Sequence, residues 1–288
     1  MTGAAAIPLA GRRVLITGAA RGIGAGTARQ LHARGSRVAL AGIEPELLAE
    51  VAAECGDAPW YECDVADRAQ VERAVAGAAE RLGGLDVAIA NAGVAAQLPL
   101  IGGDPAIFER TIAVNLLGVY YTLRAAGPHI AHPGGYALPI ASAAAALHGP
   151  MLGAYGAAKA GVEALGDTLR IELRHTGARV GVAYFGFIDT DMVRRGVDTR
   201  AVEQASRLRR ALVKPVPLAR ALDAIERGVE RRSRRVVAPG WVGAVLPLRM
   251  LIQPLVDRSG GKRLEEALAI AREEAAPLTT PQPRPGAA

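Results

Sequence analysis

The sequence of 288 residues contains only two cysteines, three lysines and few aromatic side chains. Cys55 and Cys63 have neither the spacing of a metal knuckle nor that of a redox pair, so we interpret them as buried thiols in a reducing compartment. The histidines show no metal-ligand pattern either, and no metal site is expected. Aromatic residues make up 4% and arginines are spread over many segments, so the net charge of +6 does not indicate a nucleic-acid partner.

The sequence also lacks a long apolar run. Residues 1–10 have neither the basic start nor the apolar stretch of a secretory signal, and we expect a cytoplasmic protein. The most apolar stretch, residues 241–256, is interrupted by Pro247, Arg249 and Pro254 and is shorter than the ~20 residues of a membrane span. Three interpretations of this stretch stay open: a wall of a substrate pocket, a subunit contact, or a weak peripheral contact with a membrane.

Short apolar runs alternate with longer helical patterns along most of the chain. The runs at 14–16, 38–40, 87–89 and 180–183 do not alternate with polar residues, which predicts strands buried on both faces. Between them, Pro45 opens a helical pattern, and Asp67 with Gln70 resembles a helix-start capping pair. This alternation predicts an α/β fold: a Rossmann-type doubly wound parallel sheet with helices on both faces, in a single domain.

The expected organisation has four parts. Residues 1–10 form an N-terminal extension, residues 11–240 the Rossmann domain, and residues 241–276 an apolar, helical C-terminal extension. Residues 277–288 are rich in proline and cannot bury much apolar surface, so we expect a disordered tail whose deletion leaves activity intact.

A glycine-rich segment follows the first predicted strand and opens the first helix. Gly18 permits a tight turn, and Gly22 and Gly24 let the backbone approach a pyrophosphate at the helix N-terminus. The spacing Gly-x-x-x-Gly-x-Gly differs from the common dinucleotide fingerprint. A turn of this kind can also be purely structural, so the segment alone does not decide the function.

Tyr155 and Lys159 are four residues apart in a helical pattern, with Ser142 thirteen positions before Tyr155. Residues i and i+4 share a helix face, so an ammonium beside the phenol would favour its ionised form. Such a tyrosine is suited to proton transfer near neutral pH. Taken singly, each of these side chains has an ordinary structural explanation; their occurrence together is the informative observation.

The ordered set of motifs resembles the short-chain dehydrogenase/reductase family over roughly residues 11–239. It comprises Thr17-Gly18-x-x-x-Gly22-x-Gly24, Asn91-Ala92-Gly93, Asn115, Ser142 and Tyr155-x-x-x-Lys159. The chain departs from the family at Phe185, where proline is usual, and at Ala141, where a second serine is common.

The resemblance implies an NAD(P)-dependent alcohol dehydrogenase or carbonyl reductase acting on a small molecule. Tyr155 would be the general acid or base, Ser142 would hold the substrate oxygen, and Lys159 would lower the pKa of Tyr155 and bind the nicotinamide ribose. Asn115 would anchor a water that links Lys159 to solvent. The other implied cofactor contacts are Thr17, Gly18, Arg21, Gly22, Ile23, Gly24, Gly42, Ile43, Asp64, Val65, Asn91, Ala92, Gly93, Gly186, Ile188 and Thr190.

The choice of cofactor depends on the end of the second predicted strand. An acidic residue there would bind the ribose hydroxyls of NAD and repel a 2′-phosphate, but Gly42 occupies the position. Arg21 is placed to meet a phosphate, whereas Glu44 is placed to bend back toward a ribose. We expect NADP(H), with NAD(H) as the alternative.

By the same resemblance, a lid covers the nicotinamide at about residues 191–216. It holds Arg194, Arg195, Arg200, Arg207, Arg209, Arg210 and Lys214. These charges either recruit an acidic carrier or coenzyme A phosphate or simply form a solvated helix face. Together with the apolar stretch at 241–256, they favour a lipophilic or carrier-linked substrate.

We also expect a homodimer or homotetramer. Two other functional classes stay open: a catalytically weak cofactor-binding regulator on the same scaffold, and a peripheral membrane protein. The complete set of Ser142, Tyr155, Lys159 and Asn115 argues against a regulator.

Overall fold

The computed structural model describes residues 6–197, 200–201, 215–258, 262–274, 277–280 and 282. Six parallel strands form a sheet in the order β3-β2-β1-β4-β5-β6, and β7 and β8 form a parallel pair. A bridge between Ile140 and Ala183 joins this pair to the end of β5. The strands are β1 (Arg13–Thr17), β2 (Arg37–Gly42), β3 (Trp60–Glu62), β4 (Val87–Ala90), β5 (Tyr136–Pro139), β6 (Arg179–Val180), β7 (Val182–Phe185) and β8 (Arg235–Ala238).

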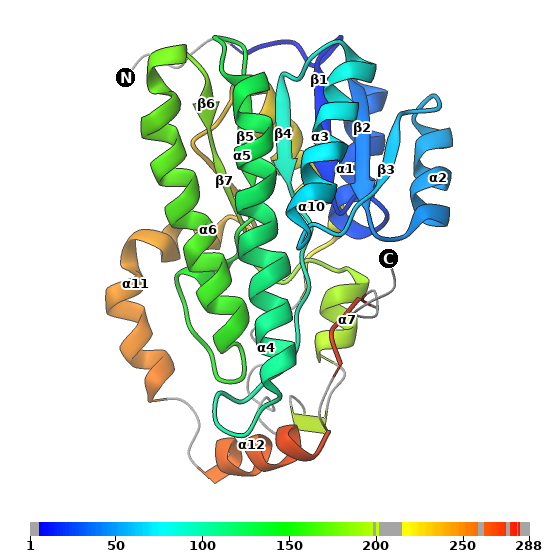
Figure 1. Cartoon of the computed structure of the whole chain (residues 1–288). Coiled ribbons are helices and arrows are strands. Elements are labelled where there is room, and N and C mark those ends of the chain that lie inside the picture. Colours follow the sequence, from blue (N-terminus) through cyan, green and yellow to red (C-terminus); the bar gives the residue numbers. More distant parts are fainter. Residues whose placement is uncertain are drawn as a thin grey trace.

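Helices cover both faces of the sheet (Figure 1). One layer consists of α3 (Arg68–Leu82), α5 (Gly118–Ile130) and α6 (Gly153–Glu172), and the other of α1 (Gly22–Ala33), α2 (Pro45–Glu54) and α10 (Leu218–Arg231). The remaining elements are α4 (Pro105–Ile112), the π turn η1 (Ala113–Leu117), the 3-10 turns η2 (Ala143–Ala145) and η3 (Leu173–Thr176), α7 (Asp191–Val197), α11 (Trp241–Asp257) and α12 (Lys262–Glu274). The predicted doubly wound α/β fold is confirmed.

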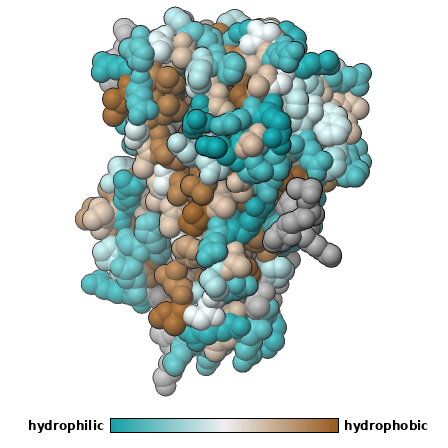
Figure 2. Space-filling view, in the orientation of Figure 1, coloured by the Kyte–Doolittle hydropathy of each residue, from teal (hydrophilic) through white to brown (hydrophobic). Residues whose placement is uncertain are grey.

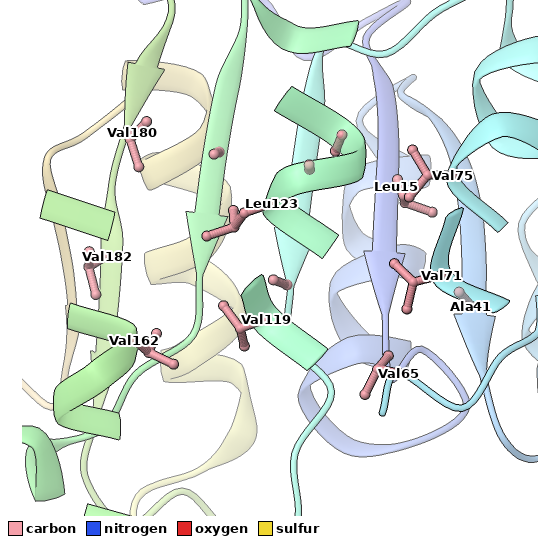
Figure 3. Packing of buried hydrophobic residues seen from close by; sticks show 14 of the residues in the cluster. Leu15, Ala41, Val65, Val71, Val75, Val119, Leu123, Val162, Val180 and Val182 are labelled. Carbon is pink, nitrogen blue, oxygen red and sulfur yellow. The ribbon is translucent and has the colours of Figure 1, made fainter. Parts of the chain in front are cut away.

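The core forms two layers because successive strand residues point to opposite faces of the sheet. Leu15 of β1 lies beside Val71 and Val75 on one face of the sheet, as Figure 3 shows, and Leu123 of α5 belongs to the same cluster. Its neighbours Val14 and Ile16 pack on the other face, against residues of α1 and α10. All three β1 residues are fully buried, which explains why the sequence of this strand shows no alternation of polar and apolar residues.

The predicted helix starts are also confirmed. Pro45 lies in the first turn of α2. Asp67 caps α3, since its Oδ1 accepts a hydrogen bond from the backbone N–H of Gln70 at 3.0 Å.

The topology determines where a ligand can bind. Strand order reverses between β1 and β4, which lie side by side although β2 and β3 separate them in sequence. In open α/β sheets the crevice outside the carboxyl ends of the strands at such a reversal is the usual ligand site. The loops after β1 and β4, which carry Gly18 and Asn91, meet at this place.

The C-terminal part of the chain differs in one respect from the expected organisation. Thr279 of the expected tail is 5% exposed, and its backbone N–H donates to the carbonyl oxygen of Ala95 at 2.9 Å. Residues 277–280 and 282 are therefore ordered, because the polar contacts of Thr279 and the packing of Leu278 against the core attach them to the domain. Residues 283–288 of the predicted tail lie outside the described residues. Among the helices of the described residues, none is long and apolar enough to cross a membrane.

Candidate active site

A cleft with an empty volume of about 1260 Å³, part of it open to solvent, lies at the carboxyl ends of the strands. It brings together most of the residues expected to bind the cofactor: Gly18, Arg21, Gly22, Ile23, Gly42, Ile43, Asp64, Val65, Asn91, Ala92, Gly93, Tyr155, Lys159, Gly186, Ile188 and Thr190. Four expected site residues, Thr17, Gly24, Ser142 and Asn115, do not line the cleft itself. Thr17 and Asn115 support the loop after β4 that does.

The glycines after β1 have different functions in this structure. A Cβ on Gly18 would come 2.6 Å from Cα of Ala92, and a Cβ on Gly24 would come 2.1 Å from the carbonyl oxygen of Gly18. Both glycines therefore permit close packing of the protein on itself. Gly22 has a φ of +55°, and a Cβ there would find its nearest protein atom 3.8 Å away, on Thr190. The absence of a side chain at Gly22 thus leaves space free in the cleft, whereas Gly18 and Gly24 allow close packing of the backbone.

The N-terminus of α1 borders the same space and has no side-chain cap. Its N-cap residue, Arg21, makes no capping hydrogen bond with its side chain, and the first turn contains no acidic residue. Gly22 and Ile23 of this turn line the cleft. Uncapped helix N–H groups and the positive end of the helix dipole are what a pyrophosphate requires. The residues present therefore fit a dinucleotide.

Arg21 and Glu44 form an ion pair at the end of the cleft next to β2. Arg21 Nε donates to Glu44 Oε2 at 2.8 Å, and the second guanidinium nitrogen bonds the other carboxylate oxygen. Gly42 lies in the same wall, where an added Cβ would meet only ordinary contacts, 3.6 Å from Leu48 and 3.8 Å from the Ala19 nitrogen. Arg21, expected to meet a 2′-phosphate, and Glu44, expected to approach a ribose, are thus bonded to each other.

Tyr155 and Lys159 extend from the first two turns of α6 to the cleft. Lys159 Nζ lies 5.6 Å from the centroid of the Tyr155 ring and donates to the carbonyl oxygen of Ile140 at 2.7 Å. Ser142, the N-cap of η2, makes a side-chain hydrogen bond with Tyr155, and its Oγ donates to the carbonyl oxygen of Phe185 at 3.2 Å. The structure thus brings together Ser142, Tyr155 and Lys159, which the sequence placed in separate segments.

The pKa values differ in part from the expectation. Burial raises the pKa of Tyr155, and the hydrogen bond with Ser142 partly offsets this. The expected lowering of the Tyr155 pKa by Lys159 remains a prediction; in this structure the ammonium bonds the Ile140 carbonyl oxygen. Burial lowers the pKa of Lys159 itself to about 8.

Asn115 is completely buried in the π turn η1. Its Oδ1 accepts a hydrogen bond from the Val94 N–H at 2.8 Å, and its Nδ2 donates to the Val94 carbonyl oxygen at 2.7 Å. Because both side-chain groups are bonded to Val94, Asn115 fixes the loop after β4. A π turn inside a helix often marks a functional position. The expected link between Asn115 and a water remains a prediction.

Asp64 lines the cleft just after β3, the strand that neighbours β2. Asp64, expected near the adenine, pairs with Arg110 at 2.8 Å and accepts a hydrogen bond from the Ala66 N–H at 3.0 Å. Arg110 also donates through Nε to Gln282 Oε1 at 2.9 Å. The sequence did not indicate that Arg110 pairs with Asp64. Nor did it indicate that the cleft wall includes Thr279, Thr280 and Gln282. A contact across 172 positions leaves no local pattern in a sequence.

The expected lid at 191–216 is described only in part. Asp191, Met192 and Val193 of α7 line the cleft, and Arg194 pairs with Asp189 at 2.8 Å. Four of the basic residues expected there, Arg207, Arg209, Arg210 and Lys214, lie outside the described residues.

Comparisons with known proteins agree with this geometry. The family description "short chain dehydrogenase" matches residues 12–201. The chain belongs to the short-chain dehydrogenase/reductase family. Family membership makes it an oxidoreductase of alcohol or carbonyl substrates that are small molecules, and the family uses NAD(P)(H).

Curated relatives and a solved structure match most of the chain. An uncharacterized oxidoreductase of Mycobacterium tuberculosis strain H37Rv is 30% identical over 84% of this chain and 94% of its own length. The cis-4-hydroxycyclohexanecarboxylate dehydrogenase of Sinomonas cyclohexanicum is 34% identical over 73% of this chain and 87% of its own. The crystal structure of a dehydrogenase/reductase from Sinorhizobium meliloti 1021 superimposes with a TM-score of 0.72 at 28% identity and covers 81% of this chain and 95% of that one.

Proposed function

We propose that this protein is an NAD(P)-dependent alcohol dehydrogenase or carbonyl reductase in which Tyr155 transfers the proton. One observation carries the proposal. Tyr155 and Lys159 line the same cleft as the uncapped first turn of α1, so a proton-transfer group and a pyrophosphate cradle share one cavity. A bound nicotinamide dinucleotide would supply the hydride in reduction and accept it in oxidation.

The protein's own groups have separate tasks in this proposal. Tyr155 gives its proton to the carbonyl oxygen during reduction, or removes the alcohol proton during oxidation. Ser142 orients the phenol through their hydrogen bond and holds the substrate oxygen. Lys159, held by the Ile140 carbonyl, binds the nicotinamide ribose and stabilises negative charge near Tyr155. Asn115 keeps the loop after β4 in place by its two bonds to Val94.

We propose a preference for NADP(H) that rests on Arg21. Gly42 supplies no carboxylate at the end of β2, and Arg21 reaches the same end of the cleft. Glu44 weakens the preference, because it already neutralises Arg21 and would repel a 2′-phosphate. We therefore expect both dinucleotides to bind, with NADP(H) favoured once Arg21 turns from Glu44 to the phosphate.

The substrate that this site favours has an apolar body beside its carbonyl or alcohol group. Val94, Ile140 and Ile188 line the cleft together with Tyr155, and Met192 and Val193 of α7 add to this apolar wall. A sugar would leave its hydroxyl groups without partners on such a surface.

We further propose a cytoplasmic homodimer or homotetramer. Figure 2 shows apolar side chains gathered along the face over which α4, α5 and α6 lie in Figure 1. Leu117, 40% exposed, and Tyr120, 43% exposed, belong to this region. Exposed apolar surface of this kind often marks a protein–protein contact.

A substrate screen followed by nicotinamide absorbance tests the proposal. Lipophilic ketones and alcohols, polar sugars and a reaction without substrate would each be assayed with NADPH or NADP⁺ and with NADH or NAD⁺. Tyr155-dependent turnover of apolar carbonyl compounds is the expected result. Binding of a dinucleotide without turnover of any carbonyl or alcohol would instead favour a regulator.

A further inference from the structure

The end of the described chain crosses the nucleotide cleft. Thr279, Thr280 and Gln282 line this cavity together with Gly18, Arg21 and the other cradle residues. We propose that this C-terminal strap (residues 277–280 and 282) clamps the bound dinucleotide and limits its release. The inference rests on the proposed function, since it assumes that the cleft binds a nicotinamide dinucleotide.

The first attachment of the strap is the loop after β4. The backbone N–H of Thr279 donates to the Ala95 carbonyl oxygen at 2.9 Å, and the Ala95 N–H donates to Thr279 Oγ1 at 3.0 Å. Asn115 makes the same kind of paired contact with the preceding residue, Val94. Two adjacent residues of the loop after β4 are therefore each held by two hydrogen bonds. Asn115 of the π turn holds Val94, and Thr279 of the strap holds Ala95.

The second attachment is at the Asp64 end of the cleft. Arg110 donates to Asp64 and to Gln282 at 2.8 and 2.9 Å, so one guanidinium joins the wall after β3 to the strap. Between the two attachments, Thr280 accepts a hydrogen bond from Gln282 Nε2 through its carbonyl oxygen at 2.8 Å. The strap is thus fastened at two places beside the cleft, at Ala95 of the loop after β4 and, through Arg110, at Asp64.

The strap is also bonded to α7, the beginning of the expected lid. Arg195 Nη1 donates to the carbonyl oxygen of Thr279 at 3.0 Å. With this bond and the two to Ala95, the backbone groups and the hydroxyl of Thr279 are all paired. Opening of α7 would therefore break a contact with the strap, and the two segments are expected to move together when the dinucleotide leaves.

Helix α12 fixes where the strap begins. Arg272 Nε donates to the Ile101 carbonyl oxygen at 3.0 Å, and Ala271 packs with Met151 and Ala201. Glu274 accepts a hydrogen bond from the Arg200 N–H at 3.2 Å. Figure 1 shows α12 at the bottom of the view and the red C-terminal segment beside α7. The strap is held by α12 at its start and by Ala95 and Arg110 beside the cleft. It therefore loses little further conformational entropy when a ligand binds beneath it.

Affinity and release measurements on matched chains test the clamp. Chains ending at Ala276 and at Gln282 would be compared with the full chain, using NADPH and NADH in calorimetry and stopped-flow fluorescence. We expect the chain ending at Ala276 to bind about tenfold more weakly and to release the dinucleotide faster, because the bonds to Ala95 and Arg110 are lost. The chain ending at Gln282 should behave as the full chain does.

Thr279→Val and Thr279→Ser form a second pair, which keeps the test valid if the shortened chain does not fold. Valine has the shape of threonine but no acceptor for the Ala95 N–H, so it should speed release, whereas serine should not. Hydrogen exchange without cofactor should show faster exchange at Ala95 in the valine variant only.

Three results would overturn the clamp. Equal affinities and release rates in all chains would show that the strap does not hold the dinucleotide, and would leave the proposed function intact. Tighter binding after its removal would show that the strap occupies space the dinucleotide needs. If the full chain bound neither dinucleotide, the proposed function and the clamp would both fail.

Discussion

The ammonium of Lys159 lies beside the Tyr155 ring, 5.6 Å from its centroid, but donates its hydrogen bond to the Ile140 carbonyl oxygen at 2.7 Å. Burial lowers the pKa of this lysine to about 8 and raises the pKa of Tyr155. Without a cofactor the pair is thus in an environment that disfavours charge on both groups. A ribose bound at Lys159 would offer its hydroxyl oxygens as further hydrogen-bond acceptors for the ammonium.

The first prediction concerns stability against pH in the absence of cofactor. The pKa of Lys159 is about 8 in the folded chain, against an ordinary value of 10.5, so between these pH values the unfolded chain binds more protons. The free energy of unfolding should rise across this window by up to about 3 kcal/mol, whereas below pH 8 the destabilising effect is constant. Denaturant titrations of wild type and Lys159→Met would be compared, so that groups common to both cancel. Identical pH dependence in the two chains would contradict the prediction.

The second prediction separates the two tasks of Lys159. Lys159→Ala should weaken dinucleotide binding in calorimetry and also reduce the turnover number, because one ammonium serves both the ribose and the charge near Tyr155. Asn115→Ala is the comparison: it frees Val94 and should disturb the loop after β4, with its main effect on stability. Unchanged dinucleotide affinity in Lys159→Ala would show that Lys159 does not contact the ribose.

The third prediction concerns cofactor preference. Gly42→Asp should shift the ratio of kcat/KM values toward NADH by ~1–3 kcal/mol, because a carboxylate would bind ribose hydroxyls and repel a 2′-phosphate. The site accepts a side chain there, since a Cβ would meet only ordinary contacts. Glu44→Gln should shift the ratio in the opposite direction by releasing Arg21. If wild type already used NADH better, Glu44 rather than Arg21 would be the residue that selects the cofactor.

The fourth prediction concerns α11. Leu248 and Leu251 are 47% and 73% exposed and are not among the residues of the cleft wall, although Trp241 at the start of the helix lies close to Gly186. Replacing both leucines with serine should leave the KM values of small and large substrates unchanged. Their apolar surface instead favours a subunit contact, so the same variant should show a lower mass by light scattering. A selective rise in KM for the larger substrate would restore these residues to the substrate pocket.

Local sequence patterns were sufficient where a single segment determines the structure. The apolar runs at 14–16, 38–40 and 87–89 predicted buried strands, and Asp67 with Gln70 predicted the start of α3, because both signals depend on neighbours in the chain. The run at 180–183, predicted as one strand, is instead divided between β6 and β7, which belong to different sheets. The spacing of Tyr155 and Lys159 placed both on one face of α6 for the same reason.

The rest depends on contacts between distant segments. Arg21 pairs with Glu44, but the sequence does not determine which acidic residue this arginine contacts. Lys159 bonds Ile140 rather than Tyr155 because the turn after β5 presents a carbonyl oxygen there. The proline-rich end was expected to be free, and no local pattern indicates that Thr279 meets Ala95 184 positions away.

The most direct test of the account is the turnover of Tyr155→Phe with its dinucleotide affinity measured alongside. Phenylalanine keeps the ring beside Lys159 and removes only the hydroxyl that bonds Ser142. We predict a fall in kcat of roughly 10²–10⁴-fold, the usual contribution of a general acid or base, with melting temperature and dinucleotide affinity close to those of wild type. Nearly full activity in this variant would remove Tyr155 from the mechanism and contradict the proposed function of the site.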